Sequence, residues 1–136
     1  MKYLFDTDML GDLMGRAPSP ALLRRLAATP PGDQATSSIT LGELLFAAQS
    51  LRRPAPDLAE RIDRVLVANV AVLPFDAGAA QTYGALRAEL ALRGTPIRDS
   101  TLRIASIALT RDLTVVTGEV CRYEPMPALR VENWLA

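Results

Sequence analysis

Apolar positions along the chain follow two different periods. Short, largely apolar runs are typical of buried strands, and they predict strands at residues 2–5, 70–75 and 113–117. The more polar stretch ATSSI, residues 35–39, is also expected to be a short strand. Between them, apolar residues recur every three or four positions, which is typical of amphipathic helices. Helices are therefore expected at residues 7–14, 20–28, 41–51, 58–69, 77–93 and 100–112.

Capping and helix-breaking residues mark where these helices begin and end. The expected N-caps are Ser19, Thr40, Asp76 and Asp99, because a short polar side chain can accept a hydrogen bond from a free backbone amide of the first turn. Gly94 is expected to end the long helix 77–93, and the stretch RRPAPD at residues 52–57 is expected to interrupt two helices.

The order of the elements predicts the fold class. Strands that alternate with helices over a short chain indicate a parallel sheet covered on both faces, a three-layer α/β/α sandwich. The chain has 136 residues and no internal repeat, low-complexity segment or linker. A single domain spanning residues 1–136 is expected.

Several acidic residues fall at the same edge of this predicted sheet. In open α/β sheets, functional sites lie beyond the carboxyl ends of the strands. Asp6 directly follows the first strand, and Glu43 lies in the first turn of the helix after the second. The segment 99–101 opens a late helix, and Glu119 follows the strand at 113–117.

Each of these acids also has an ordinary structural explanation when it is taken singly. Asp6 and Asp99 are suitable N-caps, Glu43 suits the solvated face of a helix, and Glu119 suits a turn. Their convergence changes the interpretation, because gathered carboxylates repel one another unless a cation neutralises them. Carboxylates that hold a metal ion are suited to phosphoryl transfer.

The composition limits which kinds of catalytic site and metal site the chain can contain. There is no histidine, which excludes Ser-His-Asp and Cys-His catalysis in their usual forms, and one cysteine with no histidine disfavours zinc. Any metal is therefore expected to be hard, Mg²⁺ or Mn²⁺, held by carboxylates. Fifteen basic residues balance fifteen acidic ones, so nucleic-acid binding would depend on a local patch or a metal.

The composition also indicates a compartment. Apolar residues make up 49% of the chain and charged residues 22%, without an apolar run long enough to span a membrane. The acid at position 6 disfavours a secretory signal peptide, and the lone Cys121 allows no internal disulfide. A cytoplasmic protein without a membrane partner is expected.

An ordered set of motifs resembles the PIN domain, specifically the VapC toxins of bacterial toxin–antitoxin pairs. The motifs are YLFDTDMLGDLM, SSITLGELLFA, VLPFDAGAAQTYGALRAELALRGTPI, LRIASIAL, LTVVTGE and MPALRVENW. The resemblance implies an α/β/α sandwich and a Mg²⁺- or Mn²⁺-dependent endoribonuclease that acts on RNA. It also implies a homodimer that a VapB-type antitoxin inhibits.

The resemblance assigns the site residue by residue. The first acid of the family falls on Asp6 and the second on Glu43, while Asp8 takes the place of a common asparagine. The looser fourth acid falls on Glu119. Thr7 and Thr117 match small hydroxyl positions near the site.

The third acid of the family is missing. Its position falls on Thr101, which offers a neutral oxygen but cannot neutralise an ion. Asp99, two residues earlier, is the acid nearest in sequence and could assist the metal site. The expected metal ligands and catalytic residues are thus Asp6, Glu43 and Glu119, with Asp99 as a helper.

Two functions therefore remain open. One is a VapC-like endoribonuclease whose activity is reduced by Thr101, and the other is a degenerate PIN domain that mainly binds an antitoxin and regulates. Leucine-rich faces at 20–28, 42–51 and 57–69 either cover the sheet or receive an antitoxin helix. Arginines near the acids, which could hold phosphates or antitoxin carboxylates, are Arg98, Arg103 and Arg122.

Overall fold

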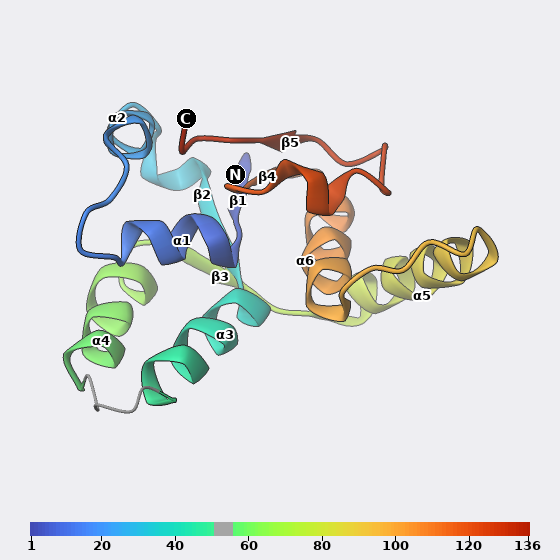
Figure 1. The fold of residues 1–136 in the computed structure, drawn as a ribbon, viewed down its shortest axis with the longest axis horizontal. Helices are drawn as coiled ribbons and strands as arrows, with labels where there is room; N and C mark the ends of the chain where they lie inside the picture. The colour runs from blue at the N-terminus through green and yellow to red at the C-terminus, as the bar shows by residue number, and fades with distance from the viewer. Residues whose placement is uncertain (51–55) are drawn as a thin grey trace.

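A five-stranded, fully parallel sheet forms the centre of the protein in a computed structural model, which describes residues 1–50 and 56–136 (Figure 1). The strand order is β3-β2-β1-β4-β5, so β1 is the middle strand. Each adjacent pair is parallel. The strands are β1 (Tyr3–Phe5), β2 (Gln34–Ser37), β3 (Ala71–Leu73), β4 (Thr114–Val116) and β5 (Val131–Glu132).

Helices connect successive strands, as parallel pairing requires. They are α1 (Thr7–Leu13), α2 (Pro20–Ala27), α3 (Ser38–Gln49), α4 (Pro56–Arg61), α5 (Ala77–Leu92) and α6 (Asp99–Thr110). A π-helical stretch, Ile62–Val67, continues α4, and short 3-10 turns occur at Pro31–Asp33 and Val120–Tyr123. None of the helices in the described part of the chain is long and apolar enough to cross a membrane.

Two hydrophobic cores lie on opposite faces of the sheet. Consecutive strand residues point to opposite faces, so Leu4 and Val115 join one core while Phe5 and Val116 join the other. Helices α5 and α6 cover the first core, and α1 to α4 contribute to the second, which also buries Trp134. This arrangement confirms the predicted three-layer α/β/α fold.

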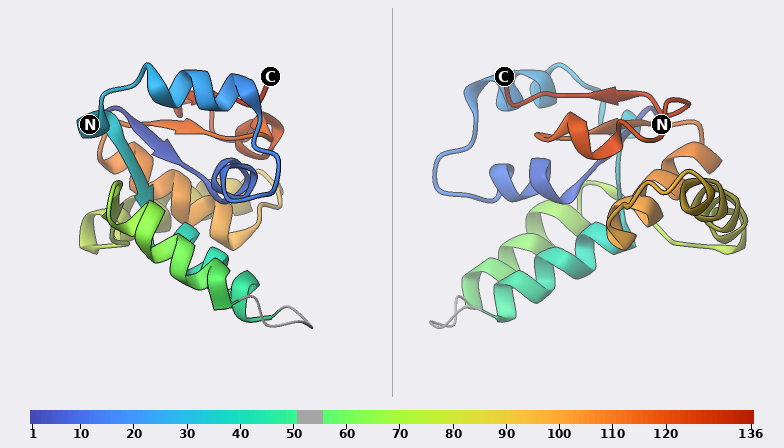
Figure 2. Two further views of the ribbon diagram at one scale, coloured as in Figure 1. Left: turned by 90° about the vertical axis from the view of Figure 1, so that its left-hand side faces the viewer. Right: turned by 45° about the vertical axis from the view of Figure 1, so that its right-hand side comes forward.

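The two helical layers differ in shape. Figure 1 shows α5 extending outward from near the lower end of α6, and the contacts between these two helices are extensive. Figure 2 shows α3 and α4 side by side at the opposite end of the molecule.

Local hydrogen bonds move several helix boundaries from their predicted positions. Ser37, not Thr40, caps α3, because the Ser37 hydroxyl accepts a hydrogen bond from the Thr40 amide at 3.0 Å. Asp99 is the first residue of α6 rather than its N-cap, which is Arg98. Ser19 and Asp76 are N-caps as predicted. Most of the predicted break at 52–57 lies outside the described residues.

The middle of the sheet sets the position of a crevice. In β1 and β4, Phe5 pairs with Val116, so the residues that follow them, Asp6 and Thr117, lie side by side beyond the carboxyl edge. The chain proceeds from β1 to β2 on one side, whereas β4 lies on the other. Ligands of open α/β sheets bind at such a point of reversal.

Candidate functional site

Asp6 is buried at the carboxyl end of the middle strand. Its side chain is 2% exposed, and its Oδ1 accepts a hydrogen bond from the Met9 amide at 3.0 Å, which caps α1. Its Oδ2 accepts one from the Tyr123 hydroxyl at 3.2 Å. The structural role as an N-cap and the predicted place in the site are therefore both compatible with this geometry.

Burial governs the protonation of Asp6. Loss of solvent raises the pKa of Asp6 above the ordinary value of 3.8, and the nearby carboxylate of Asp8 raises it further. Hydrogen bonds from Thr117, the Met9 amide and Tyr123 oppose this rise in the pKa. A nearby cation would favour the charged form of such a carboxylate.

Glu43 approaches the same crevice from the second turn of α3. Its Oε1 accepts a hydrogen bond from the Thr7 hydroxyl at 2.7 Å, which links α3 to the start of α1. The residue at position 40 faces the same way, and the Thr7 and Thr40 hydroxyl oxygens are 3.4 Å apart. Glu43 is thus oriented by Thr7, which directly follows Asp6 in the sequence.

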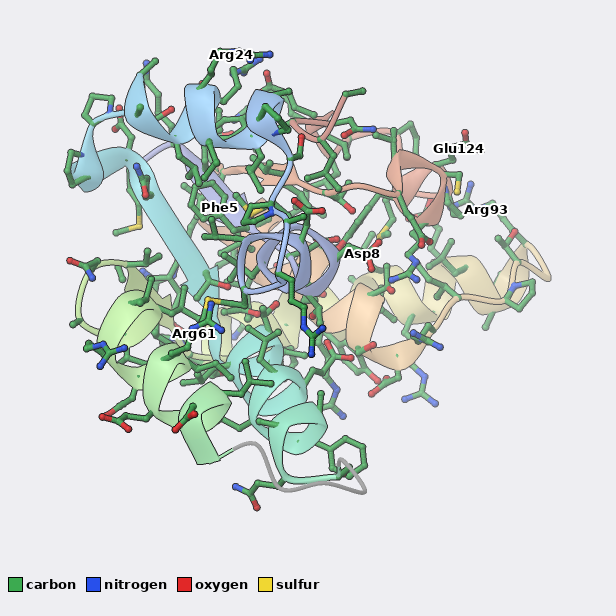
Figure 3. All side chains as sticks on the ribbon, turned by 60° about the vertical axis from the view of Figure 1, so that its left-hand side comes forward. Phe5, Asp8, Arg24, Arg61, Arg93 and Glu124 are labelled. Carbon is green, nitrogen blue, oxygen red and sulfur yellow. The ribbon has the colours of Figure 1, made fainter. Side chains whose placement is uncertain are left out.

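A small polar cavity of about 120 Å³ connects these side chains. It lies between the start of α1, the start of α6 and the 3-10 turn after β4, and Figure 3 shows Asp8 on the side of α1 that faces these segments. The residues that line it are Asp6, Thr7, Asp8, Glu43, Arg98, Ser100, Thr101, Ile104, Arg122 and Tyr123. We call this cavity the acidic pocket.

Glu119 is not among the residues that line the acidic pocket, but it pairs with Arg122, which is. Its Oε2 is 2.6 Å from Nε of Arg122, and its side chain is half exposed. The same guanidinium has a weaker contact with Asp8, 3.5 Å from Nη1 to Oδ1. The structure thus brings Glu119 near the predicted site while giving its carboxylate a close partner.

Asp99 lies outside the lining of the acidic pocket, whereas Thr101 is part of it. The Asp99 carboxylate accepts hydrogen bonds from the Tyr83 hydroxyl and from Nε of Arg103, the latter at 2.7 Å. These two donors lower the pKa of Asp99. Residues two apart on an α-helix point about 200° apart, so when Thr101 faces the pocket Asp99 faces away.

The donor set of the acidic pocket fits a hard cation that keeps much of its hydration. Three carboxylates and the hydroxyls of Thr7, Ser100 and Thr101 supply only oxygen atoms. Among the described residues, however, no three acids converge closely enough to form a complete metal site. Mg²⁺ usually keeps several water ligands and binds through one or two carboxylates, so this spacing is compatible with it.

Sequence reasoning missed the contribution of Tyr123. It is 3% exposed, its hydroxyl bonds to Asp6, and burial beside that carboxylate raises the pKa of Tyr123. It lies in a segment expected to be a loop, where no hydrophobic period indicates a direction. Asp8 was noted only as a neighbour, although its place two residues after Asp6, in the same first turn, is a signal that could have found it.

A close packing contact fixes the loop after β4. The glycine at position 118 leaves room for the side chain of Leu135, which would meet any Cβ placed there. Its neighbour Thr117 is fully buried and accepts a hydrogen bond from the Glu119 amide at 3.0 Å. The C-terminal segment thereby supports the loop that reaches the acidic pocket.

The chain is similar in sequence to proteins of known family. Residues 3–119 match the PIN domain family. The tRNA(fMet)-specific endonuclease VapC of Shigella flexneri is 33% identical over 134 residues, 98% of each chain. Ribonuclease VapC2 of Haemophilus influenzae is 29% identical over 135 residues, 99% of each chain.

Solved structures of similar fold include VapBC complexes. One is DNA-bound VapBC from Salmonella typhimurium, with a TM-score of 0.89, 31% identity and coverage of 98% of both chains. Another is VapBC2 from Rickettsia felis bound to a DNA fragment from its promoter, with a TM-score of 0.87, 26% identity and coverage of 98% and 99%.

Proposed function

The chain belongs to the PIN domain family, and on that premise we propose that it is a VapC-like toxin. Its activity is that of a divalent-metal-dependent endoribonuclease, and a cognate VapB-type antitoxin neutralises it. Support comes from relatives named as VapC ribonucleases along nearly the whole chain and from related VapBC complexes. A cytoplasmic location and a single domain over residues 1–136 belong to the same proposal.

The observation that carries this proposal is the acidic pocket at the carboxyl edge of β1 and β4. It combines the buried carboxylate of Asp6, the oriented carboxylate of Glu43 and the guanidinium groups of Arg98 and Arg122. Such a mixture of acids and arginines suits a phosphodiester held beside a cation, since arginine binds phosphate through a forked pair of donors.

Mg²⁺ or Mn²⁺ is the proposed cofactor. Asp6 and Glu43 would hold the ion, Glu119 would assist once it leaves Arg122, and Asp99 would have to turn away from Arg103 to contribute. When bound, a divalent ion polarises phosphate oxygens and lowers the pKa of water.

The protein's own groups perform the positioning. Tyr123 and Thr117 orient Asp6 through hydrogen bonds, and Thr7 fixes Glu43. The guanidinium groups of Arg98 and Arg122 are placed to bind phosphate oxygens of RNA at the pocket wall. A carboxylate kept by such contacts in one orientation loses less conformational entropy when it engages its ligand.

Thr101 supports a second candidate, a degenerate domain that mainly binds its antitoxin. The residue is 5% exposed and lines the acidic pocket where the family resemblance calls for an aspartate. A neutral side chain at that position reduces the negative charge available to hold a cation. The relatives named as ribonucleases favour the enzyme, and lowered activity remains a prediction.

Cleavage of RNA by the purified full-length chain tests this function. We expect cleavage that needs Mg²⁺ or Mn²⁺, stops with EDTA, and falls by at least about a hundredfold in Asp6→Asn, since that change removes a proposed ligand. If wild type cleaves as fast as Thr101→Asp, the prediction of reduced activity is wrong. If neither protein cleaves RNA at any metal concentration, the binding module replaces the enzyme.

A shallow hollow beside Glu43 is the proposed docking place of the antitoxin. It has a volume of about 530 Å³, is lined largely by α3 residues, and includes Phe46, whose side chain is 73% exposed. By contrast, Leu22, Leu44 and Leu66 are buried in the core, so much of the leucine-rich surface covers the sheet. A homodimer also remains proposed, and sedimentation equilibrium would measure it.

Phe46→Glu tests the hollow. It should weaken binding of the co-expressed antitoxin in a pull-down while leaving the fold unchanged, because the side chain is already exposed. Leu92→Glu is the matched control, since Leu92 is 90% exposed on α5, far along the chain from α3. Equal antitoxin binding by both variants would contradict docking at this hollow.

A further inference from the structure

The acidic pocket still contains three carboxylates although Thr101 is neutral. Its lining includes Asp6, Asp8 and Glu43, and the resemblance to related sites assigns only two of them. The third, Asp8, follows Asp6 by two residues in the first turn of α1. The loss of one charge on α6 is therefore accompanied by an extra charge on α1, across the same small cavity.

One oxygen of Asp8 is without a partner. Its Oδ2 is buried and accepts no hydrogen bond from the part of the chain that the structure describes. A buried polar atom without a hydrogen-bond partner lowers the free energy of unfolding by about 1–3 kcal/mol, and by more when it is charged. A bound cation at this oxygen would remove that cost.

The arginine near Asp8 does not satisfy it. Arg122 lies 3.5 Å from Oδ1 of Asp8 but 2.6 Å from Oε2 of Glu119, so its close ion pair is with Glu119. Glu119 is thus engaged and half exposed, whereas Asp8 keeps an oxygen available inside the pocket. Of the two acids, Asp8 is the better placed to meet a cation.

We infer that Asp8 supplies the third carboxylate around a hydrated divalent ion, in place of the acid absent at Thr101. Because no three acids of the described residues converge closely enough to ligate one ion directly, part of this set would act through water molecules that the ion keeps. The inference rests on the proposed function, because it concerns the same ion. Compared with the family pattern, the third carboxylate lies at the start of α1 rather than at the start of α6, and Asp6 and Glu43 would hold the ion in either arrangement. Asp8 is then a ligand of the ion, and Glu119 is the partner of Arg122.

Calorimetric titration of the purified full-length protein with Mn²⁺ tests this role without reference to catalysis. Asp8→Asn keeps the size of the side chain and removes its charge. We expect the Mn²⁺ dissociation constant to rise by at least about tenfold, the loss typical even of groups that only support a ligand. The double variant Asp8→Asn/Thr101→Asp should recover most of the affinity, because it returns the carboxylate across the pocket.

Two further variants make the result specific. Asp112, just before β4, has an 87% exposed carboxylate that pairs with Arg130. Asp112→Asn removes this charge and should leave the Mn²⁺ affinity unchanged. Its backbone has a φ of 55°, a conformation that asparagine tolerates. Glu119→Gln should have a smaller effect than Asp8→Asn. Thermal unfolding of each metal-free variant checks that it folds.

The outcomes separate this inference from the proposed function. Unchanged Mn²⁺ binding in Asp8→Asn, a larger loss in Glu119→Gln, or no binding by wild type would each overturn the role of Asp8, even if the wild type cleaves RNA. Mn²⁺ binding that depends on Asp8 in a protein that does not cleave RNA would support the inference and contradict the ribonuclease.

Discussion

Tyr123 donates a hydrogen bond to the carboxylate of Asp6 across 117 positions of sequence, with 3.2 Å between the hydroxyl oxygen and Oδ2. Both side chains are almost fully buried. The hydrogen bond joins the 3-10 turn after β4 to the residue that follows β1, so it links the segments that follow two adjacent strands of the sheet. It also makes the protonation of Asp6 depend on a distant segment.

Tyr123→Phe should shift the pH dependence of metal binding. The hydrogen bond from Tyr123 lowers the pKa of Asp6, so its removal raises that pKa and keeps Asp6 protonated to a higher pH. The acidic limb of a Mn²⁺ affinity profile should move to higher pH. Unfolding by urea should show a loss of about 1.5–3 kcal/mol, the usual value for a hydrogen bond to a charged group.

Tyr83→Phe is the control for this change. Tyr83 also donates a hydrogen bond to an aspartate, Asp99, but that pair is exposed on α5 and α6 outside the acidic pocket. In the Tyr83→Phe variant, the acidic limb of the Mn²⁺ affinity profile should coincide with that of wild type. A shift of equal size in both variants would mean that the hydrogen bond from Tyr123 to Asp6 does not control the pH dependence of Mn²⁺ affinity.

Asp6→Asn should stabilise the metal-free protein at neutral pH. Because the folded pKa of Asp6 is raised above 3.8, wild type loses stability as the pH rises from below that value through the raised pKa. Asparagine cannot ionise and can still cap α1. For a domain of this size, each 1 kcal/mol of added stability raises the melting temperature by roughly 3–5 °C.

Scanning calorimetry across this pH range measures the difference between the two proteins. The advantage of Asp6→Asn should shrink toward acidic pH, where wild-type Asp6 is protonated. It should also be reduced by saturating Mg²⁺, which stabilises only the form that binds it. A constant difference at every pH would show that burial of the charge is not its cause.

Arg122→Gln should strengthen metal binding. The guanidinium is a competing cation beside Asp8 and Glu119, and its removal leaves their carboxylates to an added ion. Partly exposed pairs are worth about 0.2–1 kcal/mol, so the Mn²⁺ affinity should rise by up to roughly fivefold. Arg103→Gln, which breaks a similar pair with Asp99, should have no effect on the calorimetric titration.

Trp134→Ala should destabilise the fold strongly. The indole is 1% exposed and packs edge-on against Tyr3 and Phe5, with ring centroids 4.9 and 5.6 Å away. Removing such a core aromatic costs about 3–5 kcal/mol, which chemical denaturation can measure. Leu92→Ala, at a 90% exposed position, should stay within about 0.5 kcal/mol of wild type.

Hydrophobic periodicity was sufficient to predict the architecture, and with it the sheet edge at which Asp6 and Glu43 lie. The run before Asp6 identified a buried strand, and an acid at the end of such a strand is placed by the chain itself. Glu43 was predicted although its helix begins at Ser38, because a shift of the cap from Thr40 to Ser37 extends the helix without turning its faces.

Side-chain direction limited the rest of the prediction. Asp99 and Thr101 are close in sequence, but both lie in α6, where residues two apart point to different surfaces. The sequence placed Asp99 before the helix as its cap, so this difference in direction was not predicted. Glu119 lies near the expected place, but its ion pair with Arg122 has no sequence period. Tyr123 reaches Asp6 only because the 3-10 turn folds back over the sheet edge.

The contact between Gly118 and Leu135 has an evolutionary consequence. Since any side chain at 118 would have to displace the flexible end of Leu135, the two positions share one volume. Among homologous chains they should covary, with a larger residue at one accompanied by a smaller one at the other. The size of the residue at position 135 would then vary with the size of the residue at position 118, in the loop next to the acidic pocket.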